Sequence, residues 1–211
     1  MATEIEMKLK APSVDVLRQA TQSPELSQFI RDDFITVHMK STYYDTPDGV
    51  LRQRRWTLRL RQEGEEIIAA MKTVSEKTPA GMFTRGEWQC NCNTIEEAIP
   101  ILIGLGAPAE LGGLLEKSLQ PTCTAEFDRR SVYLYMPEGV VVELAEDVGQ
   151  LFAGGRQEDI TELELELLFG SASALPPLSQ QLAEDYGLVS ETRSKYERAL
   201  ALLEAAGEEQ P

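Results

Sequence analysis

Polar and apolar residues alternate with a period of two through most of this chain, and this alternation constrains the fold more than any other feature. Side chains alternate between the two faces of a β-strand, so a period of two predicts strands. Eight segments show the pattern, and turn residues or a helical segment separate them. They are residues 2–10, 33–45, 54–63, 65–74, 81–91, 121–136, 139–147 and 157–168.

Helical segments are fewer. We expect helices near 14–30, where Pro24 bends or divides the helix, and at 95–105, 175–186 and 192–206. Eight strands with few helices in 211 residues predict an α+β fold, in which an eight-stranded antiparallel barrel or a strongly curved sheet is flanked by helices. We expect one domain over residues 1–206 and a frayed tail over 207–211.

Charge is concentrated on one face of several expected strands. The residues concerned are Glu4, Glu6 and Lys8 in the first segment, Arg59 and Arg61 in the third, and Glu162, Glu164 and Glu166 in the last. Like charges at positions i and i+2 repel unless a counter-ion lies between them. One explanation is that each face is solvated. The other explanation is that the charged residues line the lumen of a barrel, while the apolar residues lie outside and are covered by helices. Such a lumen would suit a polyanion and divalent cations.

Composition excludes several functional classes. The formal net charge is −15, so the chain would repel a nucleic-acid backbone or an anionic membrane. The single histidine, His38, lies in a strand-like run, and we expect a structural or surface role for it. Cys90 and Cys92 lack the second ligand pair of a zinc site, and an odd total of three cysteines indicates a reducing compartment.

No segment of the sequence is a candidate for export or for membrane insertion. No stretch approaches the about 20 apolar residues that a membrane span needs, and the N-terminus has no apolar core of a secretion signal. We therefore expect a cytoplasmic protein with neither a membrane nor a nucleic-acid partner.

Short motifs follow one another along the expected strands. They are Glu4-Ile5-Glu6-Met7-Lys8, Tyr43-Tyr44-Asp45-Thr46-Pro47-Asp48, Leu58-Arg59-Leu60-Arg61, Met71-Lys72, Arg85-Gly86-Glu87, then Arg129, Glu143, the Glu162–Glu166 run and Ser194-Lys195-Tyr196. The first has the pattern ExExK. In this order, from residue 4 to residue 196, the set resembles the CYTH domain family, also called triphosphate tunnel metalloenzymes.

The resemblance implies an eight-stranded antiparallel barrel that forms a tunnel, with Mg²⁺ or Mn²⁺ bound as two ions. The metal ligands it implies are Glu4, Glu6, Glu143, Glu162 and Glu164. The phosphate-binding residues it implies are Lys8, Arg59, Arg61, Lys72, Arg85, Arg129 and Lys195. Among these, Glu4, Glu6, Lys8 and Glu164 are the expected catalytic residues, and Glu87 is expected to orient a basic neighbour. The roles of Glu166 and Asp147 stay open.

The expected function is metal-dependent hydrolysis of a small-molecule triphosphate, with inorganic tripolyphosphate converted to pyrophosphate and phosphate. The spacing is most similar to that of bacterial inorganic triphosphatases. Thiamine triphosphatase and class IV-type adenylyl cyclase activities are the alternatives within the family. A module that binds triphosphate or polyphosphate without turnover is the alternative of another class. Five inward carboxylates argue against it, since capture of an anion alone needs only basic residues. The sequence does not determine the oligomeric state.

Overall fold

The computed structural model describes residues 2–73, 76–77 and 83–208, and the side chains of 4–73 and 86–206. Its sheet has ten strands: β1 (Ala2–Lys10), β2 (Ile35–Asp45), β3 (Thr57–Glu63), β4 (Glu66–Lys72), β5 (Glu76–Lys77), β6 (Phe83–Asn91), β7 (Gln120–Tyr135), β8 (Val141–Ala153), β9 (Arg156–Phe169) and β10 (Val189–Ser190). The helices are α1 (Val14–Thr21), α2 (Pro24–Ser27), α3 (Val50–Gln53), α4 (Ile95–Gly104), α5 (Leu175–Tyr186) and α6 (Lys195–Glu208). Short 3₁₀ helices are η1 (Ala109–Lys117), η2 (Pro137–Gly139) and η3 (Ala172–Ala174).

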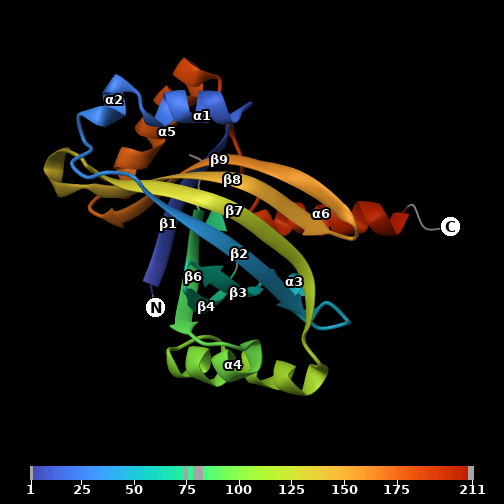
Figure 1. Cartoon of the computed structure of the whole chain (residues 1–211). Helices are drawn as coiled ribbons and strands as arrows, with labels where there is room; N and C mark the ends of the chain where they lie inside the picture. Colours follow the sequence, from blue (N-terminus) through green and yellow to red (C-terminus); the bar gives the residue numbers. More distant parts are fainter. Residues whose placement is uncertain (1, 74–75, 78–82, 209–211) are drawn as a thin grey trace.

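All strand pairs are antiparallel, in the order β10-β1-β9-β8-β7-β2-β3-β4-β6-β5. Strand β1 also pairs with β6, so residues 6–10 of β1 bond to β9 while residues 2–6 bond to β6. Each of the eight longer strands therefore has a hydrogen-bonded neighbour on both sides. The sheet curves strongly, and α1 and α5 lie along its outer side, while α6 packs on its inner side against Phe127, Leu151 and Ile160 (Figure 1).

The expected antiparallel sheet with flanking helices is confirmed. The sheet has ten strands in the described part of the chain instead of the expected eight, because β5 and β10 are two-residue strands too short to show a period. Strand β8 extends to Ala153, beyond the predicted end at residue 147, since it continues to pair with both β7 and β9. Pro24 divides the first helix as predicted, with Ser23 capping α2. Helix α6 begins at Lys195 instead of residue 192.

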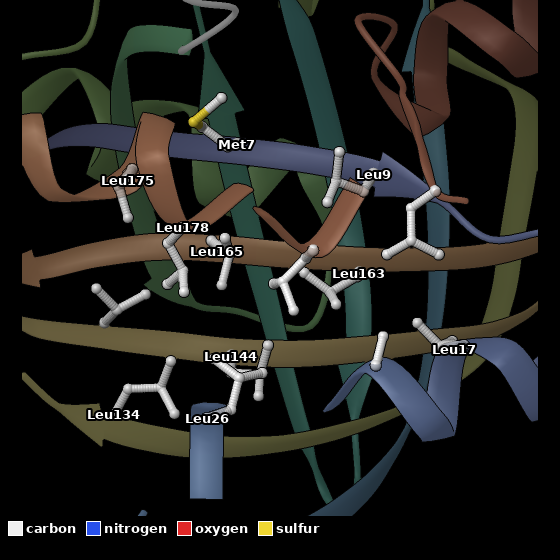
Figure 2. Close-up of a cluster of buried hydrophobic side chains, with 14 of the residues drawn as sticks. Met7, Leu9, Leu17, Leu26, Leu134, Leu144, Leu163, Leu165, Leu175 and Leu178 are labelled. Carbon is white, nitrogen blue, oxygen red and sulfur yellow. The ribbon is translucent and has the colours of Figure 1, made fainter. Parts of the chain in front are cut away.

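Apolar side chains fill the space between the sheet and its helices. Leu163 and Leu165 of β9 are fully buried and belong to one cluster with Leu17 of α1 and Leu178 of α5 (Figure 2). A second cluster packs α4 against β4 and β6. Because the leucines of β9 point toward these helices, the glutamates that alternate with them point to the opposite, concave side. In the described residues no helix is long and apolar enough to cross a bilayer.

Gly149 marks a close approach of β8 to β7. A Cβ at this position would overlap the carbonyl oxygen of Glu126 and the Cα of Phe127, both in β7. Gly149→Ala should therefore lower the free energy of unfolding by about 1–3 kcal/mol, because neighbouring backbone would have to move. Gly113→Ala is the control: Gly113 is exposed, has no neighbour within 4 Å, and should change stability by less than about 0.5 kcal/mol. Urea unfolding measures both, and equal midpoints for Gly149→Ala and wild type would contradict the prediction.

Candidate active site

A cavity of about 260 Å³ lies on the concave side of the sheet. Its lining includes side chains from all eight longer strands and from the N-terminus of α6. The sequence-predicted residues that line it are Glu4, Glu6, Lys8, Arg59, Arg61, Lys72, Glu87, Arg129, Glu143, Glu164 and Lys195. Two predicted residues are not among them. Glu162 is fully buried behind the cavity wall, and the side chain of Arg85 lies outside the described residues.

Three carboxylates form a row across adjacent strands. Glu143 of β8 lies directly opposite Glu166 of β9, which in turn lies opposite Glu6 of β1. Glu4, two residues before Glu6, adds a fourth carboxylate to the same wall. Residues directly opposite in an antiparallel pair share a face, with Cβ atoms about 5 Å apart, and like charges there destabilise the sheet. The carboxylates of this row therefore repel one another across the strands.

The pKa of Glu166 reflects this repulsion between carboxylates. Burial raises it, the negative charges of Glu4, Glu6 and Glu143 raise it further, and Lys72 lowers it only in part, so that it reaches about 7. A cation between these oxygens would relieve the repulsion. Carboxylate oxygens are the ligands that Mg²⁺ and Mn²⁺ prefer, so the donor set fits the metal that the sequence predicts.

Glu164 is in the opposite situation, although it lies only two residues from Glu166 on the same strand. Burial raises its pKa, but Lys195, Arg129 and Lys8 outweigh burial and hold the pKa well below its usual range. The Nζ atom of Lys195 lies 2.8 Å from Oε1 of Glu164, and that of Lys8 lies 3.3 Å from it. One end of the carboxylate wall is thus neutralised by cations, whereas Glu166 at the other end lies opposite two further carboxylates, Glu6 and Glu143.

The facing wall is basic. The guanidinium groups of Arg59 and Arg61 in β3 are 13% exposed, and the Nε atom of each is buried without a hydrogen-bond partner. Burial lowers the pKa of Arg61, repulsion from Arg59 lowers it further, and it falls to about 10. Buried donors without acceptors and neighbouring positive charges together favour an anion in the cavity. On the adjacent strand, Nζ of Lys72 lies 2.8 Å from Glu4 and 3.2 Å from Glu87.

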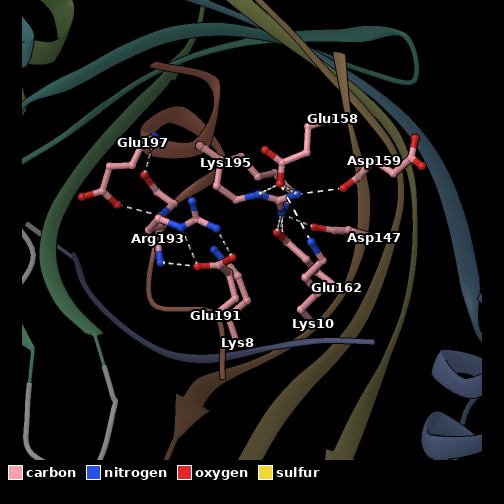
Figure 3. A network of polar contacts seen from close by, with 12 residues as sticks. Lys8, Lys10, Asp147, Glu158, Asp159, Glu162, Glu191, Arg193, Lys195 and Glu197 are labelled. Carbon is pink, nitrogen blue, oxygen red and sulfur yellow. Dashed lines mark hydrogen bonds and ion pairs between the residues drawn. The ribbon is translucent and has the colours of Figure 1, made fainter. Parts of the chain in front are cut away.

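Asp147 and Glu162, with Glu164, surround Lys195 (Figure 3). Lys195 Nζ lies 2.7 Å from Asp147 and 2.7 Å from Glu162. Arg198 of α6 is fully buried and binds both Glu162 and Glu158. The side chain of Arg129 forms two hydrogen bonds to Asp147, of 2.7 and 2.6 Å.

Other sequence motifs proved to be structural. Asp45, within the Tyr43–Asp48 motif, is buried, and its carboxylate accepts hydrogen bonds from the backbone N–H groups of Thr46 and Leu51, both at 2.8 Å. It therefore fixes the turn into α3. His38 is exposed, pairs with Asp128 at 2.8 Å and does not line the cavity. Trp88 packs in the α4 cluster.

Sequence reasoning left Glu166 undecided, although it has the same strand parity as Glu164. The signal that places it in the carboxylate row is the pairing with Glu6 and Glu143 across strands. Such register cannot be read from a single segment.

Comparison with known proteins agrees with this architecture. Residues 2–200 match the model of the CYTH domain. The chain belongs to the CYTH domain family. It is 30% identical over 207 residues to an inorganic triphosphatase of Haemophilus influenzae, covering 96% of this chain and 55% of that protein. The chain thus spans about half the length of the curated relative it matches.

Two solved structures share the fold of this CYTH chain. One is HpAC1 from Hippeastrum, a putative adenylyl cyclase described as having a dominant triphosphatase activity, with a TM-score of 0.64 and 18% identity over 95% of this chain and 96% of that one. The other is a putative adenylate cyclase from Bacillus halodurans, with a TM-score of 0.54 and 15% identity over 94% of this chain and 98% of that one. At these identities the likeness concerns the fold.

Glu164 and Glu166 offer a matched test of the charge distribution. The folded pKa of Glu166 lies above its ordinary value of 4.5, so its ionisation at pH 8 costs stability. The folded pKa of Glu164 lies below that value, so its ionisation adds stability at pH 8. In EDTA at pH 8, Glu166→Gln should raise the free energy of unfolding by about 1–3 kcal/mol. Glu164→Gln should lower it by about 3 kcal/mol. If chemical unfolding shows that both substitutions change the free energy of unfolding in the same direction, this charge distribution is wrong.

Proposed function

We propose that this CYTH domain is a metal-dependent triphosphatase that hydrolyses inorganic tripolyphosphate to pyrophosphate and phosphate. The observation that carries the proposal is the separation of charge in one cavity. Arg59 and Arg61 line one side with unsatisfied donors, and the row of Glu6, Glu166 and Glu143 lines another. A polyanion together with divalent cations matches both sides at once. In this proposal the eight longer strands act as the predicted barrel, and the cavity is its tunnel.

The basic residues would bind phosphate oxygens. Arg59 and Arg61 present their guanidinium groups from β3, while Lys8, Lys72 and Arg129 reach the same cavity from other strands. Arginine forks match phosphate geometry, and phosphoryl transfer depends mainly on positioning and charge stabilisation. Arg85 belongs to this set by motif. Glu87 contacts both Arg59, at 3.8 Å, and Lys72, at 3.2 Å, and so would orient these two cations as predicted.

The metal would be held by the carboxylate row. We assign Glu4, Glu6, Glu143 and Glu166 as the residues that hold Mg²⁺ or Mn²⁺, with Glu164 at the border of the neutralised end. Glu166 replaces the predicted ligand Glu162 in this set, because Glu162 is paired with Lys195 and Arg198. Bound ions would neutralise phosphate charge and acidify an attacking water, and a pair of ions suits both tasks. Lys8, one of the expected catalytic residues, would orient Glu164 and contact phosphate.

The cavity favours an inorganic substrate over an organic one. Its aromatic side chains already have partners: the rings of Tyr43 and Tyr196 pack on each other with centroids 5.1 Å apart. The ring of Phe127 lies under Nζ of Lys195 at 5.0 Å. Recognition of a base or a thiazole ring needs a free aromatic face and polar edge contacts. The inorganic triphosphatase relative supports the same substrate.

Release of phosphate from tripolyphosphate, with and without Mg²⁺ or Mn²⁺, tests the activity. We expect turnover that depends on the metal and a higher kcat/KM for tripolyphosphate than for ATP or thiamine triphosphate. Preference for an organic triphosphate, or formation of cyclic AMP from ATP, would assign the protein to another activity of the family. Tight binding of tripolyphosphate without any turnover would identify a binding module.

Glu6→Gln should abolish turnover while leaving the fold intact, because it removes the charge of a proposed metal ligand at nearly constant volume. Glu65→Gln is the control, since Glu65 is exposed in the β3–β4 turn. Steady-state kinetics at saturating Mg²⁺ measure both. A wild-type kcat for Glu6→Gln would mean that the metal assignment is wrong.

Arg59→Ala should reduce kcat/KM for tripolyphosphate by at least about tenfold, the effect of losing one charge-assisted contact worth about 1.5–3 kcal/mol. Arg54→Ala is a matched control, because Arg54 is exposed and stacks on Trp56 at 4.9 Å. It should leave kcat/KM within about twofold of wild type. Equal effects of the two substitutions would indicate that Arg59 does not bind phosphate.

A further inference from the structure

Three buried carboxylates form a cluster near the N-terminus of α6. Asp147 and Glu162 are 0% exposed and Glu164 is 8% exposed. One oxygen of each lies within 4.8 Å of those of the other two. Carboxylates at such spacing commonly share a divalent cation. By geometry alone this cluster would be a metal site.

The ammonium group of Lys195 already fills that position. Its Nζ atom lies 2.7 Å from Asp147, 2.7 Å from Glu162 and 2.8 Å from Glu164. The ammonium group therefore contacts all three members of the cluster and occupies the place that a shared metal ion would take.

Positive charge matches the negative charge around the cluster. The described cations that pair there are Lys8, Lys10, Arg129, Lys195 and Arg198, and the carboxylates are Asp147, Glu158, Glu162 and Glu164. Five cations face four carboxylates. A divalent ion added to this set would meet no excess negative charge and would have to displace an ammonium group that has three partners.

The other end of the carboxylate wall differs. There Glu166 lies directly opposite Glu6 of β1 and Glu143 of β8, two residues along β9 from Glu164.

We propose that Lys195 is the resident cation of the Asp147–Glu162–Glu164 cluster and excludes divalent metal from it, so that the metal of the proposed function binds outside this cluster. Arg198 is a positioning residue in this arrangement: it is fully buried and holds Glu162 against Glu158 and the backbone oxygen of Asp159. The proposal deepens the proposed function by locating its metal, and it rests on that function only for the site at Glu166.

Removal of the ammonium group should expose a latent metal site. Lys195→Ala removes the one cation that contacts all three carboxylates among the described residues and leaves space for an ion. We expect this variant to bind one more Mn²⁺ per chain than wild type, as counted by isothermal titration calorimetry without phosphate. Its melting temperature should fall in EDTA and recover with Mn²⁺, because a ligand that binds only the folded state stabilises it.

Lys117→Ala is the matched control, since Lys117 is exposed and pairs with Asp48 alone at 3.1 Å. It should bind as many Mn²⁺ ions as wild type. A folded Lys195→Ala protein that gains no ion over wild type overturns the proposal. If wild type binds no Mn²⁺ while Lys195→Ala binds one, the metal assignment at Glu166 fails and the role of Lys195 stands.

If Lys195→Ala does not fold, Asp147→Asn tests whether the Asp147–Glu162–Glu164 cluster binds metal. In the wild-type background, the proposal expects this variant to bind as many Mn²⁺ ions as wild type, because Asp147 holds an ammonium group and not a metal. Loss of one ion would overturn it. Glu166→Gln, measured in parallel, should reduce the number of bound ions and thereby test the proposed function separately.

Discussion

Burial of like charges on the concave side of one sheet is the constraint on which this structure depends. The leucines of β9 occupy the outer face and are covered by α1 and α5, so the glutamates between them must face inward. A desolvated carboxylate is costly unless a cation lies near it. Each inward acidic side chain must therefore find a basic partner from another strand, a metal ion, or a proton.

Inward carboxylates of this chain differ in the partners they find. Glu164 is held as an anion by Lys195, Arg129 and Lys8. Glu4 shares Lys72 with Glu87. Glu166 has mostly carboxylates around it, and its pKa rises to about 7. The same strand therefore carries a satisfied charge and an unsatisfied one two residues apart, and the unsatisfied one marks where an external cation would lower the energy most.

Helix α6 links this electrostatic arrangement to the fold. Its first residue, Lys195, enters the cavity wall, and Arg198, one turn later, is buried against Glu158 and Glu162 of β9. Residues three apart lie on the same side of a helix, so both cations point to the sheet. Helix α6 thus adds positive charge to that of Lys8 and Arg129, which the strands supply at this end. The match to an inorganic triphosphatase and to the CYTH domain is consistent with a cavity that handles highly charged molecules.

The sequence by itself determined the strands and which residues face inward. Both follow from local alternation: Leu163 and Leu165 are buried against helices, and Glu164 lines the cavity. Short elements such as α3, β5 and β10 were missed, since two to four residues carry no period. Only the tertiary structure decided the partner of each charge. Glu162 and Glu166 have the same parity and each precedes a leucine, yet one meets Lys195 and Arg198 while the other meets Glu6 and Glu143. That difference arises from strand register and from the docking of a distant helix, and the Coulomb energy of a side chain depends on such neighbours in space.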